Sequence, residues 1–355
     1  MRVVVCMSGG VDSTVAAHLL QEEGHEVLGL TFWFWSFQGA PDYTGATKCC
    51  ALDLAAQAAA ELGIPHETID ASKDFRRVVL QDYVDRYREG LTPNPCGRCN
   101  RFLRFGMALG FARERGFDAV ATGHHARNVL HPDGTRSLHR GADANKDQTY
   151  FLYGLHQDDL ASLRFPVGGL PKPQVIQIAR DADLSAAELP ESQDLCFALG
   201  GEASFLFEQA DLKPGPILDL QDVQLGEHRG LPRYTIGQRR GLNLPSNRPL
   251  YVVGIDAERN ALIVGDNRDL FSSGLHAGDV SYVSGRPPED GSHVLAKIRY
   301  RSPSVPARFE HRSASAFALS FEEPQRAISP GQIVALYDGD QLLGGGTIAR
   351  PAPDK

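Results

Sequence analysis

The 355-residue sequence predicts an α/β fold with a doubly wound parallel sheet, followed by a smaller β-rich part and a C-terminal β-barrel. In the first half, apolar runs typical of buried strands, such as 2–7 and 117–122, alternate with segments of helical periodicity. From residue 250 onward, short alternating runs such as 251–253 are separated by turn signals such as 338–340. Ligands of a doubly wound sheet bind beyond the carboxyl ends of its strands.

The first expected element is a strand that ends in a glycine loop. The β-branched run 2–7 is followed by Ser8-Gly9-Gly10-Val11-Asp12-Ser13, and a helix is expected from residue 14 to Gly24. The two glycines permit a sharp turn and a close ligand approach. Asp12 or Ser13 can cap the helix while its first N–H groups stay available to an anion such as a phosphate. An ordinary strand-to-helix turn is the alternative.

This loop resembles the pyrophosphate loop (PP-loop) of ATP-dependent adenylating enzymes. It differs from the G-x-x-x-x-G-K-[ST] loop of phosphoryl-transfer ATPases, because no lysine follows its glycines. The resemblance implies cleavage of ATP between the α- and β-phosphates, which yields AMP and pyrophosphate.

The next elements continue the alternation of strands and helices. A second buried strand is expected at 27–35, where Phe32 could stack on an adenine ring or pack in the core. The following expected elements are a loop at 36–47, a helix at 48–62 carrying Cys49 and Cys50, a strand at 64–70 and a helix at 74–89.

Two cysteines follow in a proline-containing segment, 92–100. Two prolines predict a rigid loop, and a helix is expected to begin at Arg101. Cys99 would then lie near a helix N-terminus and near three arginines, which favours the thiolate and makes Cys99 a candidate nucleophile. The pair Cys96 and Cys99 also suits zinc or an iron–sulfur cluster, although no second C-x-x-C completes a four-cysteine zinc site.

Further candidate site residues follow later strands and loops. The strand 117–122 delivers Gly123 and His124 to the same sheet edge as the glycine loop, where a glycine permits close nucleotide approach. The segment 146–153 combines charged and aromatic side chains, and a helix start with an apolar face is the alternative. Cys196 stands in a short polar loop, and by itself could equally be a packed thiol.

Composition narrows the class of protein. The hydrophobic content of 42% can fill the cores of two or three domains. The sequence shows no signal peptide and no apolar run long enough for a membrane span, so we expect a cytoplasmic protein without a membrane partner. Six cysteines in a reducing compartment favour catalysis or metal binding over structural disulfides.

Charge is unevenly distributed in this acidic chain, whose net charge is −8. The segment 228–255 holds five arginines and no acidic residue, and basic residues also cluster between Lys297 and Arg312. Such clusters are typical of a solvated face or of contact with nucleic acid, for which local charge matters more than the total.

Taken together, these segments make the chain resemble the tRNA-specific 2-thiouridylase family almost from end to end. The resemblance is carried by Met7 to Ser13, Thr92-Pro93-Asn94-Pro95, Cys99-Asn100, Thr122-Gly123-His124, Lys146-Asp147-Gln148, Ser192-Gln193-Asp194, Cys196-Phe197, Tyr234-Thr235-Ile236-Gly237-Gln238-Arg239-Arg240-Gly241, Arg299-Tyr300-Arg301 and Pro330-Gly331-Gln332. It implies a PP-loop adenylating domain at 1–200, a small central domain at 201–270 and a C-terminal β-barrel at 271–355, the last two contacting tRNA.

The resemblance also implies an activity, thiolation of the wobble uridine of tRNA with ATP and Mg²⁺. Cys196 would carry a persulfide from an upstream donor, a cysteine desulfurase or relay protein, and Cys99 would act as nucleophile, leaving a Cys99–Cys196 disulfide. The implied ATP contacts are Cys6, Met7, Ser8, Gly9, Gly10, Val11, Asp12, Ser13, Phe32 and Gly123. The implied tRNA contacts are Asn94, Pro95, Cys96, His124, Lys146, Asp147, Gln148, Arg299, Tyr300 and Gln332.

One position departs from the family pattern. Some members have an aspartate where this chain has Cys96, so Cys96, Cys99 and Cys196 could instead hold a four-iron, four-sulfur cluster. Two other classes of function remain open at this stage: an adenylating ligase acting on a small metabolite, and a non-enzymatic sulfur carrier or tRNA-binding module.

Overall fold

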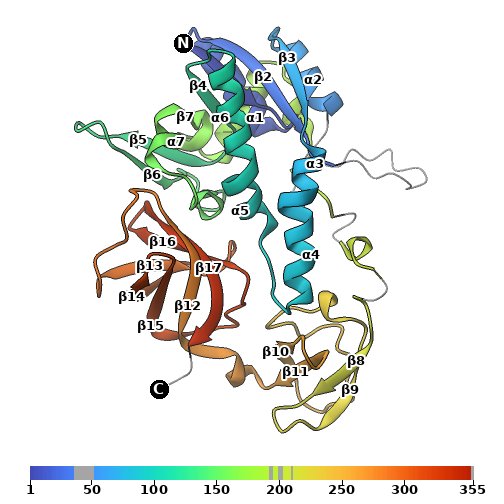
Figure 1. Ribbon diagram of the computed structural model, residues 1–355. Coiled ribbons are helices and arrows are strands. Elements are labelled where there is room, and N and C mark those ends of the chain that lie inside the picture. The colour runs from blue at the N-terminus through green and yellow to red at the C-terminus, as the bar shows by residue number, and fades with distance from the viewer. Residues whose placement is uncertain (36–51, 192–194, 199–202, 209–210, 353–355) are drawn as a thin grey trace.

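The computed structural model describes residues 1–35, 52–191, 195–198, 203–208 and 211–352. The loop expected at 36–47, Cys49, Cys50 and the Ser192-Gln193-Asp194 motif lie outside the described residues. Figure 1 shows the first sheet near the N-terminus, the C-terminal barrel below it, and a smaller β-rich part at the other end of the molecule.

The first sheet confirms the predicted doubly wound α/β fold. Its five parallel strands follow the order β3-β2-β1-β4-β7. Their bounds are β1 Arg2–Cys6, β2 Glu26–Trp33, β3 His66–Asp70, β4 Ala119–Thr122 and β7 Leu163–Arg164. The strand order reverses between β1 and β4, where Val3 is paired with Val27 on one side and Ala119 on the other. The carboxyl ends of β1 and β4 therefore mark the position where ligands of such sheets bind.

Helices cover both faces of this sheet. Alternate residues of β1 point to opposite faces, so they pack against different helices. Val3 and Val5 pack with α1 (Val11–Glu22), α2 (Leu52–Glu61) and α8 (Lys172–Asp181). Val4 packs on the other face, in the core that holds two long helical runs. The first run consists of α3 (Ser72–Phe75), the π-helical segment η1 (Arg76–Leu80) and α4 (Gln81–Arg88). The second run consists of α5 (Pro95–Cys99), the π-helical segment η2 (Asn100–Arg104) and α6 (Phe105–Glu114).

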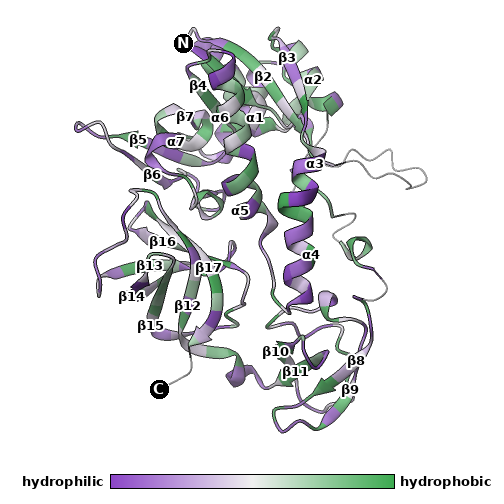
Figure 2. Ribbon diagram, viewed as in Figure 1, coloured by the Kyte–Doolittle hydropathy of each residue, from purple (hydrophilic) through white to green (hydrophobic). Residues whose placement is uncertain are grey.

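The remaining elements of the first half connect the sheet to the rest of the chain. They are β5 Ala126–Leu130, β6 Arg136–Arg140, η3 Thr149–Leu152, α7 Gln157–Ser162, η4 Pro166–Gly169, η5 Ser185–Glu188 and η6 Ser204–Leu206. Figure 2 shows largely apolar colouring on β2 and mostly polar colouring on α4 in this view, in agreement with the buried and exposed positions of the two elements.

Two further sheets follow. The middle sheet has the order β10-β11-β8-β9, with β8 Gly215–Leu218, β9 Gln224–His228, β10 Tyr251–Asp256 and β11 Ala261–Gly265. Two short 3-10 helices, η7 (Leu231–Arg233) and η8 (Asn267–Leu270), flank these strands. The C-terminal strands are β12 Phe271–Tyr282, β13 His293–Lys297, β14 Val305–Ser313, β15 Ala316–Arg326, β16 Ile333–Asp338 and β17 Gln341–Ala352.

The C-terminal strands form the predicted barrel, which is closed by pairing of β12 with β17. The β5–β6 hairpin of the first half adds to the same sheet, because Leu138 of β6 pairs with Leu342 of β17. The barrel is thus joined to the α/β part by backbone pairing as well as by side-chain packing. Among the described residues, no helix combines the length and the apolar character needed to cross a membrane.

Candidate active site

The glycine loop lies between β1 and α1, where the parallel sheet places a ligand. Gly9 has φ of +76°, a left-handed conformation that favours glycine. A Cβ atom at Gly9 would lie 2.6 Å from Leu54 Cβ, so the loop can pack against the start of α2 only without a side chain. The Ser8 hydroxyl lies 3.2 Å from Ser13 Oγ, and Ser13 Oγ donates to Gly10 O at 3.0 Å.

The start of α1 differs from the expected capping arrangement. Gly10 is the N-cap residue, and no side chain caps the helix, so neither Asp12 nor Ser13 has the capping role considered from the sequence. Ser13 instead ties the loop together through Ser8 and Gly10, and Asp12 faces other partners. The first N–H groups of a helix have no intrahelical acceptor, and together with the helix dipole they favour an anion.

Gly123 lies in close contact with protein backbone. A Cβ atom at Gly123 would lie 2.6 Å from both Asp12 C and Ser13 N. Gly123, at the end of β4, therefore lets the first turn of α1 come against the neighbouring strand. The glycine shapes the candidate nucleotide site by positioning the loop.

A cluster of charged side chains surrounds Asp12. Its Oδ1 accepts a hydrogen bond from Lys172 Nζ at 2.6 Å and lies 3.1 Å from His125 Nε2. Lys172 Nζ also lies 3.3 Å from Glu191 Oε1, and Lys146 Nζ is 2.5 Å from Glu191 Oε2. Burial opposes ionisation of Asp12, but the hydrogen bonds from His125 and Lys172 outweigh it and hold the pKa of Asp12 below its usual value.

Two predicted site residues at the sheet edge that bears the glycine loop, His124 and Cys6, are uncharged at pH 7. Burial, and then the neighbouring Arg104 and His125, lower the pKa of His124 to about 3, so its imidazole is uncharged at pH 7. Its Nδ1 lies 2.7 Å from Thr122 Oγ1. Burial raises the pKa of the Cys6 thiol to about 12, against the opposing effect of Arg104. Cys6 is therefore not a thiolate nucleophile.

The structure places the Phe32 ring in the core. Phe32 is only 5% exposed, and its ring stacks on Phe34 with centroids 5.6 Å apart, while Phe34 stacks on Phe75. Stacking of this ring on an adenine, considered from the sequence, is not compatible with that burial. The reason is that β2 is an internal strand covered by helices on both faces, so its side chains pack inward.

The first cysteine segment is a helix, which corrects the expected loop. Proline is well tolerated at the first helical position, and Pro95 begins α5 there. The Asn94 side chain is the N-cap and accepts from Gly97 N at 3.0 Å. Cys96 is exposed and Cys99 is 7% exposed within the core, so the two thiols lie one turn apart in different environments. Cys99 ends α5 just before the π-helical segment η2, a type of irregularity frequent at functional sites.

The C-terminal barrel holds the start of α5 in place. Asn94 Nδ2 donates to Gln332 Oε1 at 3.4 Å, and Gln332 Nε2 donates to Thr92 O at 3.1 Å. Thr92 N donates in turn to Pro330 O at 2.8 Å. Two predicted tRNA contacts, Asn94 and Gln332, are thus neighbours although they are 238 positions apart in the sequence.

The two cysteine segments pack on the same helical run, 72–88. On the α5 side, Arg98 Nε donates to Val78 O at 2.7 Å, and Arg98 Nη1 lies 3.2 Å from Asp82 Oδ1. On the Cys196 side, the buried Phe197 ring contacts the rings of Phe75 and Tyr83, with centroids 6.1 and 5.2 Å apart. Cys99 belongs to the core that these side chains form, and the half-buried Cys196 packs against it.

The three cysteines do not provide a metal site. In the part of the chain that the structure describes, no three His, Cys, Asp or Glu side chains come together as metal ligands, and Cys96, Cys99 and Cys196 are all described. The iron–sulfur alternative therefore has no support in this arrangement of the cysteines, and we derive no step through such a cluster.

The segment 146–148 joins the charged cluster to the barrel. Asp147 is only 2% exposed, and its carboxylate accepts from Thr149 Oγ1 at 2.7 Å, while Thr149 Oγ1 lies 3.1 Å from Tyr337 OH. A direct RNA contact of Asp147 is not compatible with this burial, so we revise its role to positioning the segment. Gln148 Oε1 accepts from His125 N at 2.9 Å, which connects the segment to the glycine loop.

Arg299 and Tyr300 stand where the barrel meets the other parts. Arg299 Nη2 donates to Ala327 O, to Ser329 Oγ at 2.9 Å and to Ile236 O at 3.3 Å, so it links the barrel to the middle part of the chain. The Tyr300 ring packs on Phe151 with centroids 4.6 Å apart. Burial raises the pKa of Tyr300, and the nearby carboxylates of Asp147 and Glu191 add to that effect.

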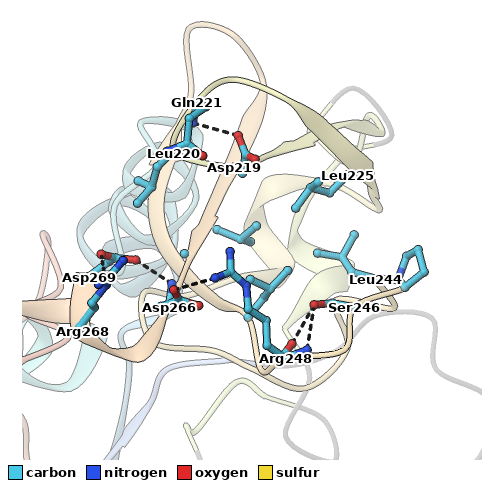
Figure 3. Close-up of a pocket in the computed structure, with 14 residues that line it drawn as sticks. Asp219, Leu220, Gln221, Leu225, Leu244, Ser246, Arg248, Asp266, Arg268 and Asp269 are labelled. Atoms are coloured by element: carbon cyan, nitrogen blue, oxygen red, sulfur yellow. Dashed lines mark hydrogen bonds and ion pairs between the residues drawn. The ribbon is translucent and has the colours of Figure 1, made fainter.

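A separate hollow of about 320 Å³ lies in the middle part (Figure 3). Arg248 Nη1 lies 3.0 Å from Asp266 Oδ2 at its edge, and Leu225 and Leu244 line it. In Figure 1 the strands that bear this hollow lie at the opposite end of the molecule from β1. The hollow contains none of the predicted site residues, and we assign the chemistry to the glycine loop instead.

Sequence reasoning missed three residues of the charged cluster: His125, Lys172 and Glu191. None of the three was among the candidate site residues named from the sequence. A signal in the sequence is the position of His125 directly after the predicted site residues Gly123 and His124. The burial of Lys172, which begins α8 and is only 5% exposed, is evident only from the structure.

Family models of known proteins match most of the chain. Family models match in sequence: a "tRNA methyl transferase HUP domain" at residues 1–200, a "tRNA methyl transferase PRC-barrel domain" at 203–266 and an "Aminomethyltransferase beta-barrel domain" at 272–348. A crystal structure of a 4-thiouridine synthetase–RNA complex with bound ATP aligns with 53% of this chain and 41% of its own, at 16% identity and a TM-score of 0.33, which is too distant to support an inference.

Curated relatives are much more similar. The tRNA-specific 2-thiouridylase MnmA of Roseiflexus sp. (strain RS-1) is 44% identical, covering 98% of this chain and 99% of that protein. The same enzyme of Chloroflexus aggregans is 45% identical over 99% of both chains, and that of Geobacter metallireducens is 44% identical over 98% of this chain and 96% of its own. On this full-length similarity, the chain belongs to the tRNA-specific 2-thiouridylase family.

Proposed function

We propose that this protein replaces the 2-oxygen of the wobble uridine of tRNA with sulfur, using ATP. The observation that carries the proposal is that the segments of Cys99 and Cys196 pack on one helical run, 72–88, in the core that also covers a face of the β1 sheet. The three relatives described above, each matched over nearly the full chain, are 2-thiouridylases, which does not favour the alternative of a ligase for a small metabolite.

The first step activates a poor leaving group. The uridine 2-oxygen attacks the α-phosphorus of ATP, the bond to the β-phosphate breaks, and pyrophosphate leaves with its electron pair. The N–H groups at the start of α1 stabilise the charge that develops on the phosphates. Asp12 is the carboxylate that would hold Mg²⁺, through Oδ2, because its Oδ1 is used by His125 and Lys172. When bound, the ion would supply positive charge against the phosphates.

The second step transfers sulfur. The terminal sulfur of a Cys196 persulfide attacks the activated C2 and forms a Cys196–S–S–C2 adduct. The Cys99 thiolate then attacks Cys196 Sγ, the adduct S–S bond breaks, and the electron pair left on sulfur forms the C=S bond as AMP departs. The product is a Cys99–Cys196 disulfide, which a thiol reductant must reduce before the next turnover.

The wobble base must leave the anticodon stack to reach these groups. We assign its reception to Asn94, Pro95 and Cys96, with His124 nearby, and assign contacts with the tRNA backbone to Lys146, Gln148, Arg299, Tyr300 and Gln332. The ATP contacts assigned from the sequence remain part of the proposal, with Phe32 contributing its backbone. We also propose an upstream persulfide donor and a cytoplasmic location, where tRNA substrates occur.

The proposal is tested by incubating the protein with unmodified tRNA, ATP, Mg²⁺, a persulfide donor (a cysteine desulfurase with cysteine) and a thiol reductant, and analysing the nucleosides by mass spectrometry. We expect 2-thiouridine at the wobble position, with AMP and pyrophosphate formed in equal amounts. A methylated nucleoside, or pyrophosphate release that is not stimulated by tRNA, would contradict it. Cys99→Ser and Cys196→Ser should each abolish turnover while leaving ATP binding intact.

A further inference from the structure

Lys172 is a buried lysine beside the glycine loop. It is the first residue of α8, and its side chain is only 6% exposed. Its Nζ lies 2.6 Å from Asp12 Oδ1 and 3.3 Å from Glu191 Oε1. Burial of an ammonium group is costly unless the group is paired. Two carboxylates therefore keep a positive charge next to the loop.

The glycine loop supplies no positively charged side chain of its own. Residues 8–13 include no lysine or arginine, whereas phosphoryl-transfer loops place a lysine directly after their glycines. A departing pyrophosphate carries several negative charges, and a helix N-terminus offers only about half of a positive charge. The fold brings Lys172 to the same place from 160 positions away in the sequence.

The partners of Lys172 leave it able to take an anion. An ammonium group has three N–H donors, and Asp12 and Glu191 account for two of them. Asp12 belongs to the loop itself, so a phosphate bound at the start of α1 would lie close to Lys172. The second carboxylate, Glu191, is shared with Lys146, so it is not neutralised by Lys172 alone.

We infer that Lys172 binds the pyrophosphate part of ATP and supplies the positive charge that the glycine loop lacks. This inference rests on the proposed function, since it places ATP at the start of α1. Lys172 then acts in ATP binding and in stabilising the departing pyrophosphate, while Asp12 and Glu191 position its ammonium group.

The test compares ATP with AMP, because AMP lacks the two phosphates that Lys172 would contact. Binding of each nucleotide is measured by calorimetry, in the absence of tRNA, for the wild type, Lys172→Met, Lys172→Arg and the control Lys213→Met, which alters an exposed lysine of the middle part. We expect Lys172→Met to weaken ATP binding about tenfold or more, the effect of losing a charged hydrogen bond, and to leave AMP binding unchanged. Lys172→Arg should recover part of the ATP affinity, and Lys213→Met should match the wild type.

Two results would overturn the inference. Equal weakening of ATP and AMP binding in Lys172→Met would show that Lys172 only maintains the loop. Unchanged ATP binding in Lys172→Met would show that Lys172 does not contact the nucleotide. In either case the proposed function would still hold if the wild type thiolates tRNA. Failure of the wild type itself to bind ATP would instead refute the proposed function and the inference with it.

Discussion

Asn94 Nδ2 and Gln332 Oε1 lie 3.4 Å apart, and this contact connects the helix that carries Cys96 and Cys99 to the C-terminal barrel. The barrel therefore has a structural role in addition to any contact with RNA, because it fixes the start of the helix that bears the candidate nucleophile. Gln332 reinforces this by donating to Thr92 O and Pro93 O.

Substitution of Gln332 by alanine should loosen this connection. Loss of hydrogen bonds to two backbone oxygens costs about 1 kcal/mol each, so peptides covering residues 92–99 should exchange amide hydrogen faster with deuterium. Thiolation should fall while ATP affinity stays unchanged. The matched control is Gln325→Ala, a half-buried barrel glutamine whose side chain donates to Glu323 O of its own strand. Unaltered exchange at 92–99 in Gln332→Ala would refute the positioning role.

Alanine at Gly123 should disturb the glycine loop. The added Cβ atom would lie 2.6 Å from backbone atoms of Asp12 and Ser13, so the loop or the end of β4 must shift. We expect a loss of stability of about 1–3 kcal/mol, typical of overpacking, together with weaker ATP binding. Gly106→Ala serves as control, because that helical position has no atom within 4 Å and alanine should stabilise it by about 0.5–1 kcal/mol. Wild-type ATP affinity in Gly123→Ala would contradict this explanation of the glycine.

Protonation of His124 should make stability depend on pH. Its pKa in the folded protein is lowered to about 3, against an ordinary value of 6.5, so below pH 6.5 the unfolded chain takes up a proton that the folded protein does not. Stability conferred by the neutral ring is thus complete above pH 6.5 and decreases as the pH falls towards 3, by up to about 1.4 kcal/mol per pH unit. Urea unfolding at pH 7.5 and 5.5 should show a smaller decrease for His124→Gln than for the wild type. An equal decrease in both proteins would mean that the imidazole titrates normally.

Cys96 should be dispensable for sulfur transfer. It is exposed, whereas Cys99 lies in the core with the Cys196 segment, and the three thiols do not form a group of metal ligands. Because Cys96 is assigned to the tRNA site, Cys96→Ala should weaken the apparent affinity for tRNA. At saturating tRNA it should keep the aerobic thiolation rate within about twofold of the wild type. Loss of activity in Cys96→Ala together with a visible iron–sulfur absorption band in the anaerobically reconstituted wild type would restore the cluster hypothesis.

Sequence reasoning predicted the elements whose signals are local. The β-branched run before Ser8 and the glycines after it define a strand and a turn without reference to the rest of the chain. Pro95 was misinterpreted because proline excludes the interior of a helix and not its first turn. Phe32 was ambiguous because an aromatic residue at a strand end suits a ligand and a core equally well, and only the packing of Phe34 and Phe75 decides.

Residues brought together from distant positions were harder to foresee. Lys172 and Glu191 stand in ordinary helix and loop sequences, and only the packing of α8 against α1 brings the ammonium to Asp12. The burial of Asp147 likewise depends on the β5–β6 hairpin and the barrel, whose pairing across the domains has no local signal. Pairings of this kind arise from tertiary contacts, which a single sequence does not encode in any one motif.

The account as a whole depends on the meeting of two thiols. In a single turnover with persulfide-loaded protein, tRNA and ATP, but without reductant, the digested protein is analysed by mass spectrometry for a peptide that joins Cys99 to Cys196. We predict that this linked peptide forms in step with 2-thiouridine and in equal amount. Formation of 2-thiouridine while both thiols remain open to alkylation would contradict the account.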